Sequence, residues 1–491
     1  MNKDELLALL DEPTEKPSSN IIGKLLEILS SSNDFSYLTL SLLILRKHKD
    51  LVDISALSKV LNIKKEAAKE ILCNPQTEVS FPISNGSQTK LNKVYIIKIS
   101  TAAALILGNV KHFDLQIKTL QKLTSQSFFL MFEDNFEKGS SWMLAAYAAI
   151  IARRQEYLND FIFSGTVYNS GIIGEVEFLK EKQLFAKEAG KILIDHTKIS
   201  NIEELDYIIN NNFLDLPFCI ALRPSRTSPS TLQSAIENLN TIKDTIKKHF
   251  GITIDSIKKI YGIDDNELIF AIKGNSLEET TWEDLIKEVY LKTINIRNKI
   301  NKYIVFHFSI LGPATFALCF GAIFGAKERF VFYQYLQNEY HPVLNFRNKN
   351  IRSLKTITKN FKHIAFEWLK NNNNHLAIIM YLASHNPRGD AEAFLKTKNT
   401  QFDTLILYNK DNQGFIDLND SWEALISEIY SVYNLTKNAH YKQKSLFVSV
   451  PVAIAFGLGV ALETYENIDI YNYSFEQNGY FLVANLKHLF V

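Results

Sequence analysis

"PATFALCFGAIFGAKERFVFYQY" at residues 313–335 and "PVAIAFGLGVALETYENIDIYNY" at residues 451–473 align without a gap. The second stretch begins 138 positions after the first (451 − 313 = 138), and two tyrosines near the end of each copy coincide. Upstream, "TWEDLIKEVY" (281–290) matches "SWEALISEIY" (421–430), with apolar residues at i, i+3, i+4 and i+7. That spacing is the buried stripe of a helix. The repeat predicts two copies of one folding unit in the C-terminal half of the chain.

Each copy has the residues expected of a strand–helix–strand unit. Pro313 and Pro451 suit the first turn of a helix, where a missing N–H group costs least. An apolar strand, "YIVFHFS" or "SLFVSV", precedes each helix. Small residues that would let each helix approach a sheet closely recur four apart, at Ala317 and Gly321 and at Ala455 and Gly459. We therefore predict two fused α/β lobes related by a pseudo-twofold axis.

This P-x-x-x-A-x-x-x-G pattern, present twice, resembles the SAVED domain, a sensor family that fuses two Rossmann-like (CARF-like) lobes. The resemblance covers residues 255–491, with lobes at about 255–350 and 351–491. It implies binding of a cyclic oligonucleotide, with a cyclic tri- or tetra-adenylate as the activating ligand. It also implies that copies of the chain associate head to tail when the ligand binds.

Ligands of such lobes are expected at the carboxyl ends of strands and at helix N-termini, where backbone N–H groups favour phosphate. The loops in these places predict ligand contacts at Ser309, Ser384, Asn386, Arg388 and Ser449. Arg388 is either a phosphate contact or a solvated turn arginine. "LRPSRTSP" (222–229) is either the corresponding loop of the first lobe or the exit of a preceding domain.

A second group of motifs lies before this repeat. "KGSSWMLA" (138–145) begins a predicted helix, and "FSGTVYNSGIIGEVEFLKEKQLFAKEAGKILI" (163–194) supplies a strand, a turn, a Lys/Glu-rich helix and a strand. In this order the elements resemble the proteolytic domain of Lon proteases. The resemblance places the nucleophile at Ser141 and the base at Lys180, with Ser164 at the position of the family's strand threonine.

The chemistry explains why such residues would be paired. A serine hydroxyl needs a base to take its proton, and a lysine, with a pKa of about 10.4, acts as a base only when its pKa falls. Burial lowers it, and the apolar "VEFL" before Lys180 favours burial. Ser164 would orient the amine, and free N–H groups at the helix start would hold an oxyanion. Taken singly, Ser141 is typical of a helix cap and Lys180 of a solvated helix; their order favours the catalytic interpretation.

Several positions depart from the Lon pattern. Ser140 replaces the proline before the nucleophile, and Trp142 and Met143 replace the alanine and glycine after it. We expect these two bulky residues to narrow the entrance or to crowd the oxyanion site. Glu177 and Phe178 replace the two glycines before the lysine. Either the protease makes a narrow, regulated cut, or the chain is an inactive relative. Because no ATPase segment precedes the domain, ATP-independent cleavage is expected.

The N-terminal part reads differently. Residues 1–19 predict a flexible leader and residues 20–79 a helical module. Within it, "ISALSKVLNIKKEAAKEIL" (54–72) has helix-turn-helix spacing. That module either contacts DNA or packs against protein; its few lysines, alternating with glutamates, favour packing. The protease domain is expected at 80–229 and a helical linker at 230–254.

Composition limits the function classes further. The 491 residues carry a formal net charge of +1, which argues against a general nucleic-acid binder. Three scattered cysteines predict neither disulfides nor a cysteine-rich metal site. The longest apolar runs are too short to span a membrane, and the polar N-terminus is unlike a signal peptide. We expect a cytoplasmic protein with no metal and no cofactor.

Together these features predict an α/β and α+β multidomain chain: a helical N-terminal module, a Lon-type α+β protease domain and two CARF-like lobes. The whole resembles Lon–SAVED effectors of prokaryotic antiviral systems related to CRISPR. The resemblance implies a serine endopeptidase with a Ser-Lys dyad that a cyclic oligoadenylate activates to cleave a partner protein encoded nearby. The alternative is a catalytically dead, ligand-binding scaffold that acts through its N-terminal helices.

Overall fold

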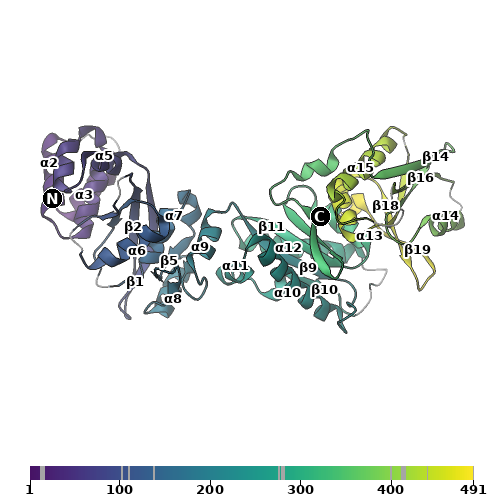
Figure 1. Cartoon of the computed structure of the whole chain (residues 1–491), viewed down its shortest axis with the longest axis horizontal. Coiled ribbons are helices and arrows are strands. Elements are labelled where there is room, and N and C mark those ends of the chain that lie inside the picture. The colour runs from purple at the N-terminus through teal and green to yellow at the C-terminus, as the bar shows by residue number, and fades with distance from the viewer. Residues whose placement is uncertain are drawn as a thin grey trace. The chain divides into compact units, whose positions relative to one another are not determined.

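The computed structural model describes residues 1–11, 17–100, 103–108, 111–136, 139–274, 277, 282–398, 401–410, 416–439 and 441–489. The chain divides into two compact units, unit 1 (residues 1–211) and unit 2 (residues 212–491). Both mix helices and strands (Figure 1). Among the described residues, no helix combines the length and the apolar character needed to cross a membrane.

Unit 1 begins with five helices, which we call the N-terminal module: α1 (Lys3–Asp11), α2 (Ser19–Ser31), α3 (Phe35–Lys47), α4 (Ile54–Val60) and α5 (Lys65–Cys73). Side chains on nearly every face of α3 are buried, so α3 is the centre of the module. Asn62 supplies the predicted turn between α4 and α5, at φ 52°. The expected flexible leader differs from the structure, because α1 is helical and buries Leu6; residues 12–16 lie outside the described residues.

The rest of unit 1 surrounds a four-stranded sheet of order β1-β2-β4-β3. Its strands are β1 (Gln76–Ser84), β2 (Thr89–Lys98), β3 (Leu105–Ile106) and β4 (Phe128–Phe132). Two small sheets follow, formed by β5 (Phe161–Phe163) with β8 (Ile192–Ile194) and by β6 (Thr166–Val167) with β7 (Ile173–Gly174). The remaining helices are α6 (Asp114–Thr124), α7 (Met143–Ile151), α8 (Leu179–Glu188) and α9 (Ile202–Asn210), with 3-10 turns η1 (Lys49–Leu51), η2 (Lys111–Phe113) and η3 (Gln155–Leu158).

The first lobe of unit 2 has a sheet of order β10-β9-β11-β12-β13, in which only β13 is antiparallel. Its strands are β9 (Phe213–Ala221), β10 (Ile269–Ala271), β11 (Tyr303–Leu311), β12 (Phe330–Leu336) and β13 (Glu339–Asn345). Its helices are α10 (Thr231–Phe250), α11 (Ile254–Tyr261), η4 (Asp265–Glu267), α12 (Trp282–Lys299) and α13 (Ala314–Phe324).

The second lobe has a sheet of order β14-β16-β15-β17-β18-β19. Its strands are β14 (Ile364–Leu369), β15 (His375–Tyr381), β16 (Asp403–Asn409), β17 (Gln443–Ser449), β18 (Asp469–Ser474) and β19 (Gly479–Asn485). Its helices are η6 (Ile351–Lys355), α14 (Arg388–Thr397), α15 (Trp422–Leu435), η7 (Thr436–Ala439), α16 (Val452–Leu462), η8 (Glu463–Tyr465) and η9 (Leu486–Leu489).

The predicted duplication is confirmed by the strand order, because β10-β9-β11-β12-β13 and β16-β15-β17-β18-β19 are the same arrangement. Even the register shift between Phe332 and Tyr333 recurs 138 positions later, between Ile470 and Tyr471. The first lobe, however, starts at β9 rather than at residue 255, because β9 pairs in parallel with both β10 and β11.

This earlier start settles the two alternatives for the segment 222–229. It follows the carboxyl end of β9, in the position that the loop after β15 occupies in the second lobe. It is therefore a loop of the first lobe. Likewise α10, in the region expected to be a linker, packs on β9 and β10 of the same lobe.

The two repeat helices, α13 and α16, pack against one another at their glycines. A Cβ on Gly321 would lie 2.1 Å from the carbonyl oxygen of Phe456, and one on Gly459 would lie 2.0 Å from that of Leu318. These two contacts are equivalent, because Gly459 lies 138 positions after Gly321 and Phe456 lies 138 positions after Leu318. The small residues thus serve helix-to-helix contact, and the expectation that they face a sheet is wrong for these glycines.

Two hydrogen bonds between the lobes repeat in the same way. The Thr315 hydroxyl donates to Asn472 Oδ1 (2.8 Å), and the Ala453 N–H group donates to Gln334 Oε1 (3.2 Å). Each bond joins the first turn of a repeat helix to the outer parallel strand of the other lobe. A first-turn side chain of α13 and a first-turn N–H group of α16 therefore bond the opposite lobe.

We predict that Gly321→Ala and Gly459→Ala each destabilise unit 2 by at least about 2 kcal/mol, because the added methyl group meets backbone that cannot rotate away. Gly389→Ala is the matched control, since open space surrounds the position of its Cβ near the start of α14. Calorimetry of the full chain should show one transition lowered in the first two variants and unchanged or raised in the control. If all three variants show the same change in transition temperature, the close contact between α13 and α16 is contradicted.

Candidate functional site

Ser141 lies in the turn that leads into α7, held against a strand end. The Gly165 N–H group donates to the Ser141 carbonyl (2.9 Å), and Leu144 N–H donates to the Gly165 carbonyl (3.0 Å). Beside them the hydroxyls of Ser140 and Thr166 are 2.6 Å apart. The structure therefore brings together two of the predicted elements, the Gly-Ser-Ser turn and the S-G-T-V strand.

Ser164, the residue before Gly165, is fully buried. Its N–H group donates to the Ile194 carbonyl at the end of β8 (2.9 Å), which fixes its position. Its hydroxyl has no hydrogen-bond partner among the described residues. Leaving a buried polar group without a partner costs about 1–3 kcal/mol.

The lysines of α8 differ from the expectation. Lys180 is exposed, whereas Lys182 is only 4% exposed and lies on the face that buries Ala186. Residues two apart on a helix point about 200° apart, so the two lysines cannot share an environment. Burial lowers the pKa of Lys182, opposed by the nearby Glu177 carboxylate. Lys180 therefore lacks the desolvation that a base requires, and Lys182 has it.

The sequence contained a signal for this assignment. Leu179, Lys182 and Ala186 stand at i, i+3 and i+7, the spacing of a buried helical stripe. Leu179 and Ala186 pack in one cluster with Ile162 and Leu193 of β5 and β8. The apolar run before Lys180 led to the prediction that Lys180 is buried, which is wrong. The helical period would have indicated Lys182 instead.

The residues that were expected to obstruct the entrance point elsewhere. Trp142 and Met143 are 0% and 2% exposed. The Trp142 ring lies edge-on to Phe113 and Phe132, at 5.2 Å from each, and its Nε1 donates to the Gly139 carbonyl (3.0 Å). Both side chains belong to the core under α7, so the expectation that they narrow the entrance is wrong.

Phe178, at a position where the Lon pattern has a glycine, has an unusual backbone conformation. Its φ of 55° lies in the left-handed region, which disfavours side chains. The ring is 40% exposed and lies over Gly86 in the turn between β1 and β2. The turn into α8 therefore carries an aromatic ring in a conformation that glycine adopts more readily.

In unit 2, the expected ligand residues fall into two groups. Ser309 is fully buried in the central strand β11, opposite Cys219 of β9. Burial also raises the pKa of this Cys219 thiol to about 12. Ser309 is therefore a core residue, and the expectation of a surface contact is wrong for it in this structure.

The other expected ligand residues lie at one edge of the second sheet. Ser384 and Asn386 are exposed in the loop after β15, and Ser449 ends the neighbouring strand β17. The Leu382 N–H group donates to the Ser449 carbonyl (2.7 Å), so this loop and the end of β17 are in contact.

Arg388 starts α14 and is already engaged. Its Nε donates to Glu392 Oε1 (3.0 Å), and its NH1 lies 3.8 Å from Glu367 Oε2. A phosphate would have to compete with both carboxylates. The corresponding loop of the first lobe carries two exposed arginines, Arg223 and Arg226, which the sequence reading left without a role.

Comparison with known proteins gives one family match. Residues 296–484 match the family model described as the SMODS-associated and fused to various effectors sensor domain, SAVED. No curated protein matches the chain in sequence.

Among solved structures, the chain is similar to the Acinetobacter baumannii Cap4 SAVED/CARF-domain containing receptor with the cyclic trinucleotide 2'3'3'-cAAA. That likeness has 13% identity and a TM-score of 0.32, over 55% of this chain and 51% of the receptor. The chain therefore spans about half the length of that receptor. The Moraxella osloensis Cap4 receptor gives 11% identity and a TM-score of 0.32, over 84% of this chain and 94% of that one.

The Tellina virus 1 VP4 protease, in an intramolecular acyl-enzyme complex, gives 16% identity and a TM-score of 0.22, over 32% of this chain and 93% of the protease. At such scores these likenesses add nothing to the geometry described above. The family match therefore stands by itself, and it is limited to residues 296–484, which match the SAVED domain.

Proposed function

We propose that the chain is a serine protease that a cyclic oligoadenylate activates, with Ser141 as nucleophile, Lys182 as base and Ser164 as the group that orients the amine. The observation that carries the proposal is the burial of Lys182, which lowers its pKa on a helix packed against β8. Ser164, whose hydroxyl has no partner among the described residues, is tied to the same strand. Lys180, the base that the Lon resemblance named, is replaced by Lys182.

In this reaction the neutral Lys182 amine takes the Ser141 hydroxyl proton as Oγ attacks the carbonyl carbon of the substrate peptide. The ammonium then gives its proton to the departing amine as the C–N bond breaks, leaving an acyl-enzyme. Water, deprotonated by the same lysine, hydrolyses the ester. The N–H groups of Met143 and Leu144 already donate to the Ser140 and Gly165 carbonyls. The oxyanion would therefore be held by the backbone N–H groups just before α7.

The ligand half of the proposal rests on the SAVED match and on the exposed loops of the two lobes. The first turns of α13 and α16 are engaged by Asn472 and Gln334, so the loops after β9 and β15 are the better phosphate sites. Arg223 and Arg226 would supply the positive charge on the first-lobe loop. A cyclic tri- or tetra-adenylate is the proposed ligand, copies would associate on binding it, and the substrate would be a partner protein encoded nearby.

Cleavage of a co-encoded candidate protein, with and without cyclic oligoadenylates, tests the protease. Ser141→Ala and Lys182→Met should each lower ligand-dependent cleavage by at least about 1,000-fold, because they remove the nucleophile and its base. Lys180→Met, on the exposed face of the same helix, should leave cleavage unchanged. If Lys180→Met abolishes cleavage and Lys182→Met does not, the base is misassigned. If Ser141→Ala retains the biological effect, the chain is the scaffold that the alternative describes.

The pH dependence tests the role of the buried lysine. The rate of Ser141 acylation by a small active ester should rise with pH, with a midpoint below 10.5, because only neutral Lys182 accepts the proton and burial lowers its pKa. Glu177→Gln should move the midpoint of this rise to lower pH, because the Glu177 carboxylate raises the pKa of Lys182. Glu175→Gln is the control. If the midpoint is the same in Glu177→Gln and in the wild type, Lys182 is not the base.

Ligand binding tests the assignment of the loops. Arg223→Ala and Arg226→Ala should each weaken binding of a cyclic oligoadenylate by roughly 10- to 100-fold, the effect of losing a charge-assisted hydrogen bond. Arg388→Ala should have an effect of less than about threefold, because its cation is already paired with two carboxylates. Calorimetric titration measures all three, with the exposed Arg352→Ala as control. The reverse ranking would return the phosphate contact to Arg388.

A further inference from the structure

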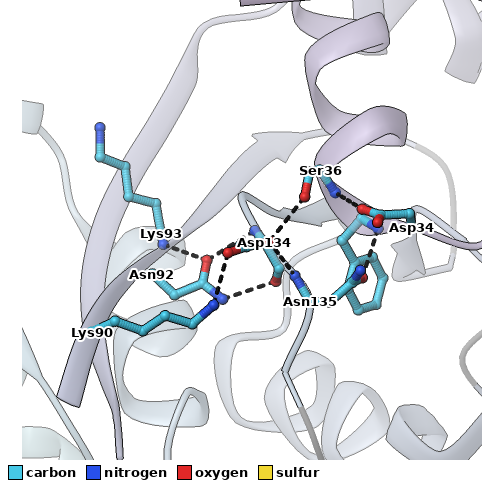
Figure 2. Close-up of polar contacts among 8 residues, drawn as sticks. Asp34, Ser36, Lys90, Asn92, Lys93, Asp134 and Asn135 are labelled. Atoms are coloured by element: carbon cyan, nitrogen blue, oxygen red, sulfur yellow. Dashed lines mark hydrogen bonds and ion pairs between the residues drawn. The ribbon is translucent and has the colours of Figure 1, made fainter. Parts of the chain in front are cut away.

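The segment between β4 and α7, described at residues 133–136 and 139–142, carries Ser141 and is anchored to the N-terminal module (Figure 2). Asp134 is the centre of the anchor. Its Oδ1 accepts from the Ser36 hydroxyl of α3 (2.9 Å), and its Oδ2 accepts from Lys90 Nζ of β2 (2.8 Å). The side chain of Asn92 donates to the Asp134 carbonyl (2.9 Å) and accepts from its N–H group (3.1 Å).

The next residue continues the anchor. Asn135 Oδ1 accepts from the Phe35 N–H group at the first residue of α3 (2.8 Å), a donor that has no partner within the helix. The Thr39 hydroxyl donates to the Phe132 carbonyl at the end of β4 (2.7 Å). Two consecutive turns of α3 therefore hold the chain on its way to Ser141.

An aromatic path continues from this anchor to the nucleophile. Phe136 stacks on Phe35 of α3, at 6.3 Å between centroids, and on Phe113, at 5.5 Å. Phe113 in turn meets the edge of Trp142, at 5.2 Å. Trp142 is the residue directly after Ser141, so packed side chains connect α3 to the nucleophile without a gap.

The charge of Asp134 strengthens the anchor. Burial opposes its ionisation, but the hydrogen bonds from Lys90 and Ser36 outweigh burial and lower the pKa of this carboxyl. Asp134 is therefore ionised at neutral pH. Its bonds to α3 and β2 are of the stronger, charge-assisted kind.

We propose that α3 is a positioning element of the Ser141 site, acting through Asp134, Asn135 and Phe136 on the turn that presents the nucleophile. Its effect on catalysis rests on the proposed protease function, whereas the mechanical coupling does not. Productive attack requires atoms within a near-attack geometry, and a displacement of 1 Å can lower a rate by about 100-fold. The N-terminal module would thus serve as a control point for the protease, and a protein that binds it would tune Ser141.

The test uses the full chain with Ser36→Ala, Asp134→Ala and their double variant. Asp53→Ala is the matched control, because it also removes a side-chain hydrogen bond from the N-terminal module. The Asp53 carboxylate caps α4 by accepting from the Ser55 N–H group, and among the described residues it has no bond to the segment that carries Ser141. Two quantities are measured: amide hydrogen exchange at residues 139–146, and the labelling rate of Ser141 by a fluorophosphonate. We expect Ser36→Ala and Asp134→Ala to speed exchange and to slow labelling by at least about fivefold.

The double variant should be no slower in labelling than Asp134→Ala alone, since both changes remove the same bond. Asp53→Ala should change neither quantity. If Ser36→Ala and Asp134→Ala match Asp53→Ala in exchange, or change exchange without changing labelling, the positioning role is overturned. Labelling is measured with cyclic tri- or tetra-adenylate present, since the proposed protease is activated by such a ligand. If the wild type is then not labelled at Ser141 while exchange responds as expected, the protease function fails and the coupling stands.

Discussion

The backbone contact between α13 and α16 is the constraint on which unit 2 depends. Each helix touches the other where a glycine leaves no side chain, at Gly321 and at Gly459. The two contacts are equivalent because the tandem duplication gives both lobes the same helix, presented in the same way. The cross-lobe bonds of Thr315 and Ala453 then follow from the same symmetry. Through these bonds, each lobe holds the repeat helix of the other lobe at its first turn.

The two lobes have the same arrangement of strands and helices, but they carry different side chains at equivalent positions. At equivalent places on neighbouring strands, the first lobe pairs Asp215 with His307 (2.8 Å) and the second pairs His375 with Ser445 (2.8 Å). The caps after α13 and α16 diverge too: Gly325 and Glu463 both take a positive φ, at 69° and 54°. A side chain in this conformation costs about 1–3 kcal/mol. The Glu463 carboxylate offsets part of that cost by bonding Lys355 (2.6 Å).

How much of this could be read from the sequence depended on how local each feature is. The repeat was visible because its helices align without a gap, and it predicted the two lobes. The membership of β9 was not visible, since parallel strands pair across long separations, and 81 residues (222–302) lie between β9 and its partner β11. Lys182 was readable from the helical period of α8. The direction of Trp142 was not, because a bulky residue at a helix start suits a core and an entrance equally.

In unit 1, three locally unfavourable features are associated with the layer formed by β5, β8 and α8. Lys182 is buried at a lowered pKa, Ser164 has a buried hydroxyl without a partner among the described residues, and Phe178 holds a left-handed turn. None of them improves packing, and each would be relieved by an ordinary substitution: leucine, alanine or glycine. A fold keeps such features where a site requires them. Under the proposed mechanism, the Ser164 hydroxyl would orient the Lys182 amine, and each group would then have a use that packing alone does not give it. If the proposal holds, these three features are kept for the site rather than for packing, and an inactive chain would have no physical reason to retain them.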